Sequence, residues 1–375
     1  MILVLRPGAS ADETAEVLRA LEQRGCEGRL VQTGTAPDGR PRYTSRADVS
    51  PCNPGQTPPC NRPSGQDLML TNTHQGSGTV FATDFSKTWR TRAGRFDAYL
   101  AYGYQDIKDV NSGTSSTALS NWDSFAVADI NDPKLETSNY EIEHQFKGLF
   151  SWRKAFFGDN ETSMSVVAER RSGRAFSYTF GAGTSVFGDP RQGSRQRDLF
   201  YVPGAAGSAE DVIYEAQCTA ADVTNLVPGC ASTASFSSAN AAAAQFRSDT
   251  DAFIESQGLE RYRGKIVPRN SGRSPWVTTL DMRLAQEIPI WRKMHGVVSL
   301  DVENLANLIN NDWGQVSQVS FIYVAPVLDA NRIDATTGRY VYRPRAGFTG
   351  PTAPVPSLTA LNSVWRVQLG LRFEF

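Results

Sequence analysis

The residue types that most often do chemistry are present in this 375-residue chain, but their spacing does not build a catalytic site. The three histidines, His74, His144 and His295, are scattered, with no HExxH or comparable ligand spacing. Ser172 and Gly173 form no GxSxG nucleophile elbow. We therefore expect no catalytic residue, no metal site and no cofactor, and the sequence predicts that the protein is not an enzyme.

Asp301 and Glu303 are the carboxylates that acid/base chemistry would first suggest. They alternate with valine and leucine, so we interpret them as polar residues of a strand that face a wet lumen. Arg170 and Arg171 are expected to face the same lumen. With Arg174, they could alternatively line a passage for an anionic ligand, which we favour less.

The five cysteines include no CxxC pair, so they do not indicate a metal site. Cys52 with Cys60, and Cys218 with Cys230, lie in stretches rich in Pro, Gly, Ala and Ser. We predict a short disulfide within each of these two loops, as an oxidising compartment allows. The alternative is unpaired loop thiols, and Cys26 is left over.

Charge and hydropathy limit the class of protein. The 38 basic and 39 acidic side chains give a net charge of -1, which provides no broad basic surface for nucleic acid. A run of about 18 apolar residues, as a membrane-spanning helix requires, does not occur. Membrane-spanning strands need only about 10 residues with every second one apolar, and they leave mean hydropathy unremarkable.

Period-two alternation with aromatic residues is the main structural pattern and predicts strands with one apolar face. It appears around 81–86, 96–105, 146–152, 164–168, 276–284, 298–302 and 365–375. The connections are alternately short, as in 89–95, 153–160 and 289–295, and very long, as in 106–140, 172–274 and 306–362. Short turns on one side and long extracellular loops on the other are typical of outer-membrane barrels. The sequence predicts a mainly β protein, the last seven or eight strands of an antiparallel transmembrane β-barrel.

The long connections also show local patterns. Residues 33–72 are rich in Pro, Gly, Asn and Arg and predict a polar loop. Residues 240–245 and 249–257 predict two short helices. Segments 316–324 and 339–342 predict either hairpin strands within the last loop or the upper parts of barrel strands.

The final segment has the clearest alternation in the chain. An edge strand of a soluble β-sandwich is the alternative, but that would not explain why the chain stops on an aromatic residue. The segment resembles the carboxy-terminal signal that the barrel assembly machinery recognises in outer-membrane proteins. That signal would comprise Trp365, Val367, Leu369, Leu371, Phe373 and Phe375. Trp152, Trp276, Trp291 and Trp365 are predicted to lie at strand ends, in the aromatic girdle of a membrane interface.

Longer motifs give a more specific resemblance. They include TAPDGRPRY at 35–43, TSNYEIEHQF at 137–146, RRSGRAFSYTF at 170–180, GLERYRGKIVPRN at 258–270 and DVENLANLINNDWG at 301–314. Over residues 31–375 the chain resembles the carboxy-terminal barrel portion of an Oar-like TonB-dependent outer-membrane transporter. The resemblance implies a cell outer-membrane location, lipid and the barrel assembly machinery as partners, and uptake of a bulky, unidentified substrate. Because the resemblance is to Oar-like proteins, a protein of adhesion or surface interaction is the alternative.

The family's plug domain and TonB box have no counterpart in the sequence. We therefore expect the chain to reach the TonB system only through a plug that it does not itself supply, and to be inactive alone. Residues 1–30 form a separate short strand–helix segment, foreign to the barrel by this interpretation. Residues 1–28 resemble the amino-terminal segment of a 3-deoxy-7-phosphoheptulonate synthase, but no catalytic barrel of that enzyme follows, so its activity is not carried over.

Overall fold

The structure is a computed structural model that describes residues 32–43, 73–184, 186–189, 192–291, 294–348, 350, 357–358 and 363–374. The predicted strand–helix segment of residues 1–30 lies outside these residues, as do Cys26 and the Cys52–Cys60 pair. The described chain is mainly β and contains several sheets, none of which closes into a barrel. Among the described helices, none has the length and apolar character needed to cross a membrane.

The largest sheet, here called the main sheet, holds eight antiparallel strands, seven of them in one continuous path. The path runs β22-β16-β15-β7-β6-β4-β3. In chain order these strands are β3 (Ser77–Thr91), β4 (Gly94–Asp109), β6 (His144–Phe157), β7 (Asn160–Arg171), β15 (Val277–Trp291), β16 (Met294–Glu303) and β22 (Arg366–Glu374). The eighth, β5 (Glu136–Thr137), pairs with the end of β4.

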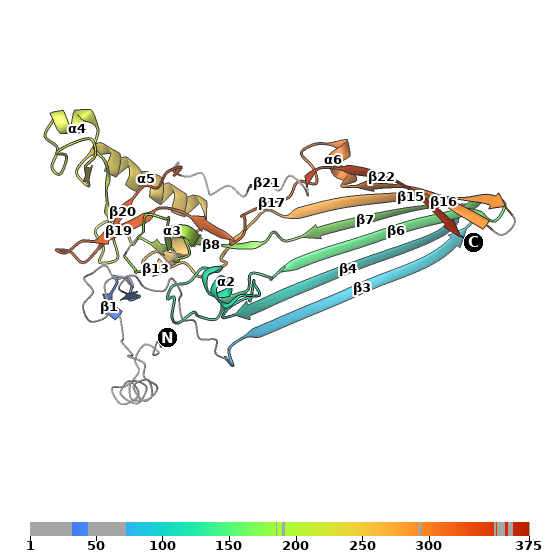
Figure 1. The fold of residues 1–375 in the computed structure, drawn as a ribbon, viewed down its shortest axis with the longest axis horizontal. Helices are drawn as coiled ribbons and strands as arrows, with labels where there is room; N and C mark the ends of the chain where they lie inside the picture. Colours follow the sequence, from blue (N-terminus) through green and yellow to red (C-terminus); the bar gives the residue numbers. More distant parts are fainter. Residues whose placement is uncertain are drawn as a thin grey trace, which may run out of the picture.

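Three hairpins close one end of the main sheet, which we call the turn end (Figure 1). Only two residues separate β3 from β4 and β6 from β7, and Gly158 supplies the left-handed conformation in the second turn with φ of 64°. The long connections all leave from the opposite end, the loop end. The predicted alternation of short turns and long loops is confirmed, and β22 runs toward the turn end.

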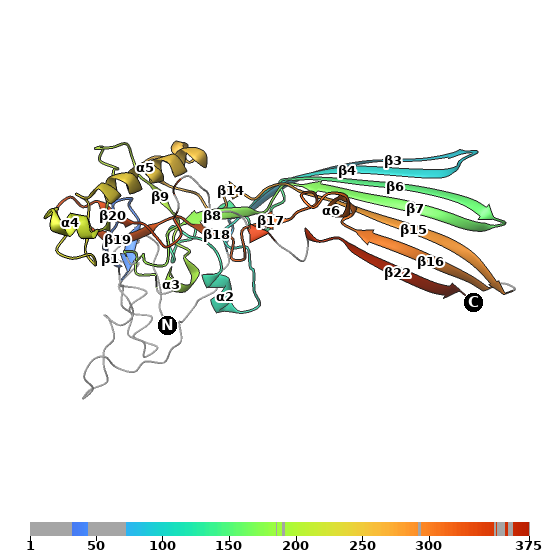
Figure 2. The same ribbon diagram turned by 90° about the horizontal axis from the view of Figure 1, so that it is seen from above.

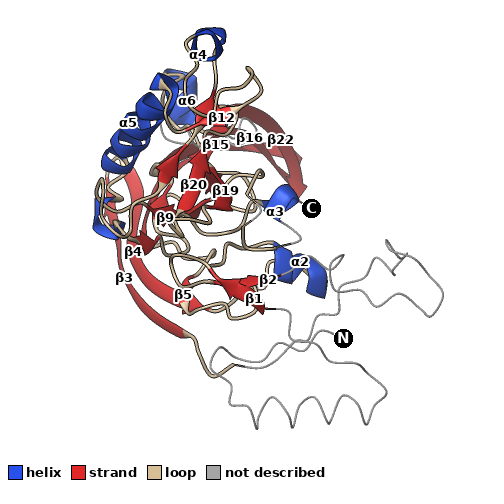
Figure 3. Cartoon of the chain, turned by 90° about the vertical axis from the view of Figure 1, so that its left-hand side faces the viewer, coloured by secondary structure: helices blue, strands red, loops and turns tan. Residues whose placement is uncertain are grey.

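Seen along the strands, the main sheet is an open arc (Figure 3). Its edges are β3 and β22, and neither edge is paired on its outer side by another described strand. The seven strands of the continuous path are 9 to 16 residues long. A tilted membrane strand needs roughly 10 residues.

The long connections and the segment 32–43 fold together beyond the loop end into a second body, here called the loop assembly (Figure 2). Its strands are short. They are β1 (Gln32–Thr35), β2 (Pro41–Tyr43), β8 (Ala175–Thr179), β9 (Tyr201–Val202), β10 (Ile213–Tyr214), β11 (Ala216–Gln217), β12 (Phe236–Ser237), β13 (Lys265–Ile266), β14 (Gly272–Arg273), β17 (Ser317–Gln318), β18 (Val324–Pro326), β19 (Asp329–Ile333), β20 (Tyr340–Arg343) and β21 (Ser357–Leu358). Its helical segments are α2 (Ala118–Asp123), α3 (Gln192–Arg195), α4 (Ala220–Thr224), α5 (Ala241–Ser256), the 3-10 helix η2 (Glu260–Tyr262) and α6 (Leu305–Ile309).

Helix α5 replaces the two short helices that the sequence predicted for 240–245 and 249–257. Asn240 caps it by accepting a hydrogen bond of 2.8 Å from the backbone N–H of Ala243. Four consecutive alanines begin it, and the spacing of Phe246, Phe253 and Ile254 gives one buried stripe. Because the helix continues through 246–248, both predicted segments belong to the single helix α5.

The last loop confirms the prediction for one segment and differs from it for the other. Residues 340–342 fall in β20, which pairs with β19 as a hairpin within the loop, one of the two predicted alternatives, and does not extend a strand of the main sheet. Residues 316–324 do not form a hairpin of their own. Instead β17 pairs with β21, and β18 lies parallel to β8 from a different loop.

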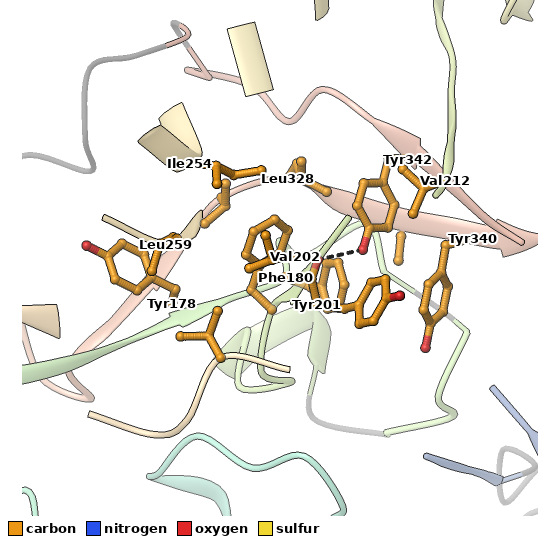
Figure 4. Packing of buried hydrophobic residues seen from close by; sticks show 14 of the residues in the cluster. Tyr178, Phe180, Tyr201, Val202, Val212, Ile254, Leu259, Leu328, Tyr340 and Tyr342 are labelled. Atoms are coloured by element: carbon orange, nitrogen blue, oxygen red, sulfur yellow. Dashed lines mark hydrogen bonds between the residues drawn. The ribbon is translucent and has the colours of Figure 1, made fainter. Parts of the chain in front are cut away.

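The hydrophobic core of the described chain lies in the loop assembly (Figure 4). Phe180, Phe200 and Tyr342 are fully buried and their rings contact one another. The Tyr342 hydroxyl donates a 2.8 Å hydrogen bond to the carbonyl oxygen of Tyr201, so its polar end is satisfied. No residue of this cluster comes from the seven long strands of the main sheet.

Candidate functional site: the two faces of the sheet and the loop assembly

Cross-strand pairing assigns every residue of the main sheet to one of two faces, because directly opposed residues point the same way. Leu369 is opposed to Leu300, and Leu300 in turn to Leu284. The same row continues to Met164 on β7 and Trp152 on β6. We call the side that carries this row the apolar face, and the other side the polar face.

Large side chains on the apolar face are open to their surroundings. Leu369 is 76% exposed, Leu371 73% and Leu100 61%. These side chains are exposed although β22 pairs with β16 along its length and β4 lies between two paired neighbours. The terminal residues Val367, Leu369, Leu371 and Phe373 all lie on this face. Trp365 immediately precedes β22, and Phe375 lies outside the described residues. Recognition of this strand by the assembly machinery stays a prediction.

Aromatic side chains form two bands across the apolar face. At the turn end, Trp89 stacks on Phe96 at 5.5 Å and Trp152 lies 5.8 Å from Phe156. The loop-end band contains Tyr102, Tyr104, His144, Phe146 and Trp276. Along β4, from Phe96 to Tyr104, the two bands are separated by roughly 27 Å at about 3.4 Å per residue.

Three of the four predicted girdle tryptophans lie at strand ends. Trp276 and Trp365 immediately precede β15 and β22 at the loop end, and Trp291 is the last residue of β15 at the turn end. Trp152 lies nearer the middle of β6, because that strand continues to Phe157, so the prediction of a strand end is wrong for this residue. Its indole N–H donates a 2.8 Å hydrogen bond to the carbonyl of Ala93 in the neighbouring turn.

The polar face carries ion pairs across neighbouring strands. Arg283 lies 3.1 Å from Asp301 on the adjacent strand, and Arg366 lies 3.6 Å from Glu303. Arg171 shares this face with Glu169, at 3.8 Å. Three of the four residues predicted to share a polar side of the sheet, Arg171, Asp301 and Glu303, therefore do so. Each acidic group has a basic neighbour, which does not resemble a pair of carboxylates arranged for acid/base catalysis.

Arg170 lies on the apolar face, so the prediction that it would share a side with Arg171 is wrong. Successive residues of a strand point to opposite faces, and Arg170 is opposed to Phe146 and Thr278 in an apolar row. Its guanidinium carbon lies 5.4 Å from the ring centre of Trp276. The mistake was to assign the residue by its charge, although alternation counted from Ala168 gives the correct face.

Small side chains show which face is on the inner side of the arc. Ser151, Ala285 and Ser299 on the polar face are buried, with 4%, 9% and 5% of their surface exposed. On the inner side of a curved sheet, side chains converge and shield one another, whereas on the outer side they diverge. The polar face therefore lines the concave side of the sheet seen in Figure 3.

A buried arginine attaches the β1–β2 hairpin to the loop assembly. Arg40 is 3% exposed, donates to the Asp38 carboxylate at 2.6 Å and 2.8 Å, and donates to the carbonyl of Leu199 at 2.8 Å. Its guanidinium also lies over the ring of Phe187, at 4.0 Å. Burial alone would lower the pKa of Arg40, but attraction to Asp38, Tyr340 and Asp198 together with the hydrogen bond to Asp38 outweighs it and raises the pKa above the ordinary value.

A second buried cluster lies beside Arg40. Arg197 and Asp189 form an ion pair of 2.6 Å, and both side chains are fully buried. Asp198 is 3% exposed, and burial raises its pKa to about 8, with repulsion from Asp189 adding to the effect and Arg40 and Arg197 opposing it. Asp198 is adjacent in sequence to the pair and belongs to the packed interior, where these charges fix how the loops fit together.

Arg269 and Asn270 join the loop assembly to the end of the main sheet. Arg269 donates to the carbonyls of Val110 at 2.9 Å and Asp109 at 2.5 Å, and to the Asp109 carboxylate at 2.9 Å. Asn270 donates to the carbonyl of Thr137 at 2.7 Å. Three segments far apart in sequence are thus held at the loop end of β4.

The predicted disulfide between Cys218 and Cys230 is confirmed. It closes a surface lobe that contains α4, whose first turn is capped by a reciprocal pair of hydrogen bonds between Thr219 and Asp222. The lobe contributes no residue to the aromatic core. The other predicted pair, Cys52 with Cys60, lies outside the described residues.

An open hollow of about 350 Å³ lies on the loop assembly, a feature that sequence reasoning missed. It is lined by residues 194–196 at the end of α3 and by 319–322 and 324–326. Residues 194–196 and 319–326 are more than 120 positions apart in the sequence, so no local sequence pattern predicts the hollow. No group of His, Cys, Asp or Glu suited to hold a metal ion is found among the described residues.

Comparison of the chain with models of protein families, with curated proteins and with solved structures found no match.

Proposed function

We propose that this chain forms part of the wall and the outer loops of a TonB-dependent transporter in a bacterial outer membrane, and that it takes part in uptake of a bulky substrate. The observation that carries the proposal is the exposed apolar face of the main sheet, bordered at both ends by aromatic bands. A membrane barrel has an apolar band about 25 Å tall between two such girdles. At a strand tilt of about 40°, the roughly 27 Å between the bands corresponds to about 20 Å of membrane thickness.

Water is an unfavourable environment for this face. Exposed apolar surface costs about 25 cal/mol per Å², and monomeric soluble proteins rarely expose contiguous apolar patches larger than a few hundred Å². Here large apolar side chains are exposed along strands from β3 to β22, including Phe81, Phe85, Leu100, Phe146, Leu284, Ile288, Leu369, Leu371 and Phe373. Acyl chains would cover this surface without requiring a second protein layer.

The two edges of the arc define what else the proposal needs. In a bilayer, each unpaired backbone group costs several kcal/mol, so a membrane sheet must close on itself. Further strands pairing with β3 and β22 would complete the wall. Within it, the charged polar face would line a wet interior and the loop assembly would face the cell exterior, where it receives the substrate.

Energy and assembly come from partners in this proposal. The final strand would be read by the barrel assembly machinery, and the TonB system would act through a plug inside the barrel. We propose no catalytic role, because the two carboxylates that acid/base chemistry would first suggest, Asp301 and Glu303, are each paired with an arginine.

Fractionation of the cells that make this protein tests the location. We expect the chain in the outer-membrane fraction, extracted only by detergent, and with mobility in gel electrophoresis that changes on heating. The proposal would be refuted if most of the protein were recovered, without detergent, in a soluble fraction that contains no outer-membrane marker.

Adhesion is the second candidate, favoured by the packed core of the loop assembly, which presents a preformed surface independent of any ligand. Deleting the genes of the TonB system separates the two functions. Transport predicts that uptake is lost while surface attachment is unchanged. An attachment defect caused by truncating the loop assembly, in cells whose uptake is normal, would favour adhesion.

A further inference from the structure

The apolar face contains a groove near the loop end, spanning β3 to β15 and about 490 Å³ in volume. Its floor includes Gly148 and Ala168, which are directly opposed on β6 and β7. Because two neighbouring strands lack a large side chain at the same level, the surrounding side chains enclose a hollow. Its other apolar-face lining residues include Phe85, Leu100, Tyr102 and Phe146.

Arg170 is the cation that the apolar face places at the loop-side end of this groove. The other charged lining residues, Asp84, Lys147 and Glu169, belong to the polar face. Arg170 lies one row nearer the loop end than Ala168 and is exposed. Within the part of the chain that the structure describes, we find no hydrogen bond or ion pair to its guanidinium, only the contact with Trp276 at 5.4 Å. A cation–π contact uses none of the guanidinium N–H groups in a hydrogen bond, so these donors remain available to an anion.

The groove and the arginine require different chemistry a short distance apart. The floor and walls favour an alkyl chain, since glycine, alanine, leucine and phenylalanine offer no hydrogen bonds there. The guanidinium favours a planar or tetrahedral oxyanion, which it can bind through two parallel N–H donors. A free phosphate would satisfy Arg170 and leave the groove empty, whereas an alkyl chain alone would leave the cation without a counterion.

We propose that this groove binds an anionic membrane lipid, with one acyl chain between Leu100 and Ala168 and the headgroup phosphate on Arg170. The proposal rests on the proposed function, because it requires the apolar face to lie in a bilayer. It adds a defined lipid site to that location. The site lies in the loop-end aromatic band, at the depth where headgroup meets acyl chain.

Trp276 is a natural probe for the test, since it is 44% exposed and contacts Arg170. The full chain is reconstituted in phosphatidylcholine vesicles, and its fluorescence is quenched with brominated phosphatidylglycerol or brominated phosphatidylcholine. The difference between the protein and its Trp276→Phe variant isolates the signal of this tryptophan. One basic residue near an anionic lipid is worth about a fivefold preference, so the anionic probe should bind about fivefold more strongly.

Three variants locate the effect. Arg170→Gln should abolish the preference, whereas Arg171→Gln, which removes the same charge from the opposite face, should keep it. Gly148→Leu should reduce quenching by both lipids, because it fills the groove; a Cβ at this position meets only Leu100 Cδ2, at 3.4 Å, so the strand can accept it.

The outcomes separate this site from the proposed function. Equal quenching by the two lipids, or equal loss of preference in Arg170→Gln and Arg171→Gln, would overturn the lipid site while leaving the membrane location intact. Absence of quenching of any tryptophan by either lipid would overturn the membrane location, and the lipid site with it.

Discussion

The main sheet and the loop assembly place their large apolar side chains in opposite environments. Leu369 and Leu371 on β22 are 76% and 73% exposed, whereas Phe180 and Tyr342 in the loop assembly are fully buried. The sheet is ordered by continuous backbone pairing between long strands. The loop assembly has short strands and is ordered by side-chain packing. The loops therefore carry a core of their own, whereas the strands leave their large apolar side chains exposed.

This difference predicts that the two regions respond differently to the same mutation. Removing an aromatic ring from a packed core leaves a cavity, whereas removing one from an exposed face does not.

The largest effect is expected for Phe180→Ala. Its ring contacts Phe187, Phe200 and Tyr342, so its loss should destabilise the loop assembly by about 3 to 5 kcal/mol. Hydrogen exchange should accelerate throughout the loop assembly and remain slow in the strands. Phe85→Ala, at a position 60% exposed on the main sheet, is the matched control and should leave the loops unchanged. Similar exchange in both variants would contradict an independent loop core.

Arg269→Met should weaken the junction between the two regions. The carbonyls of Asp109 and Val110 would lose their donor, at a cost of about 3 kcal/mol. Faster exchange at the junction, around 105–110 and 136–139, is the readout. Arg283→Met removes a pair that is 57% exposed on the arginine side and should cost less than about 1 kcal/mol. Equal changes in exchange for Arg269→Met and Arg283→Met would show that buried donors do not hold the junction.

Replacing Cys218 and Cys230 by serine should loosen only the lobe that they close. A loop of this length loses about 2 to 3 kcal/mol when its disulfide is removed. Limited proteolysis should then cut between residues 218 and 230, and α5 should remain protected because its buried side belongs to the aromatic core. Cleavage spreading into α5 would show that the lobe and the core unfold together.

The stability of the loop assembly should fall as pH rises from about 5 to 8. Burial raises the pKa of Asp198 from its ordinary value of 3.8 to about 8, so between these values the folded state holds more protons than the unfolded chain. The free energy of unfolding then decreases with increasing pH. Thermal melting of the loops at several pH values measures it, and Asp198→Asn should flatten the dependence. An unchanged slope in that variant would assign the effect to another group.

The sequence by itself determined the features that depend on neighbouring residues. Period-two alternation located the long strands, and the short connections at 89–95 and 153–160 identified the hairpins. Cys218 and Cys230 were paired because they lie 12 positions apart in one loop rich in Pro, Gly, Ala and Ser. Counting alternate positions would also have placed Arg170 on the apolar face, had position been preferred to charge. Each of these features follows from local geometry, in which a strand repeats every two residues and a short loop keeps its ends close.

Only the tertiary structure decided that the long connections form a core. Tyr342 donates to the carbonyl of Tyr201 across 141 positions, and Arg269 reaches Asp109 across 160. Such contacts have no period in sequence, because each depends on three loops arriving together at the same end of the sheet. Loop composition predicted polar connections, yet a minority of aromatic side chains, brought together from distant segments, was sufficient to exclude water and order the whole region.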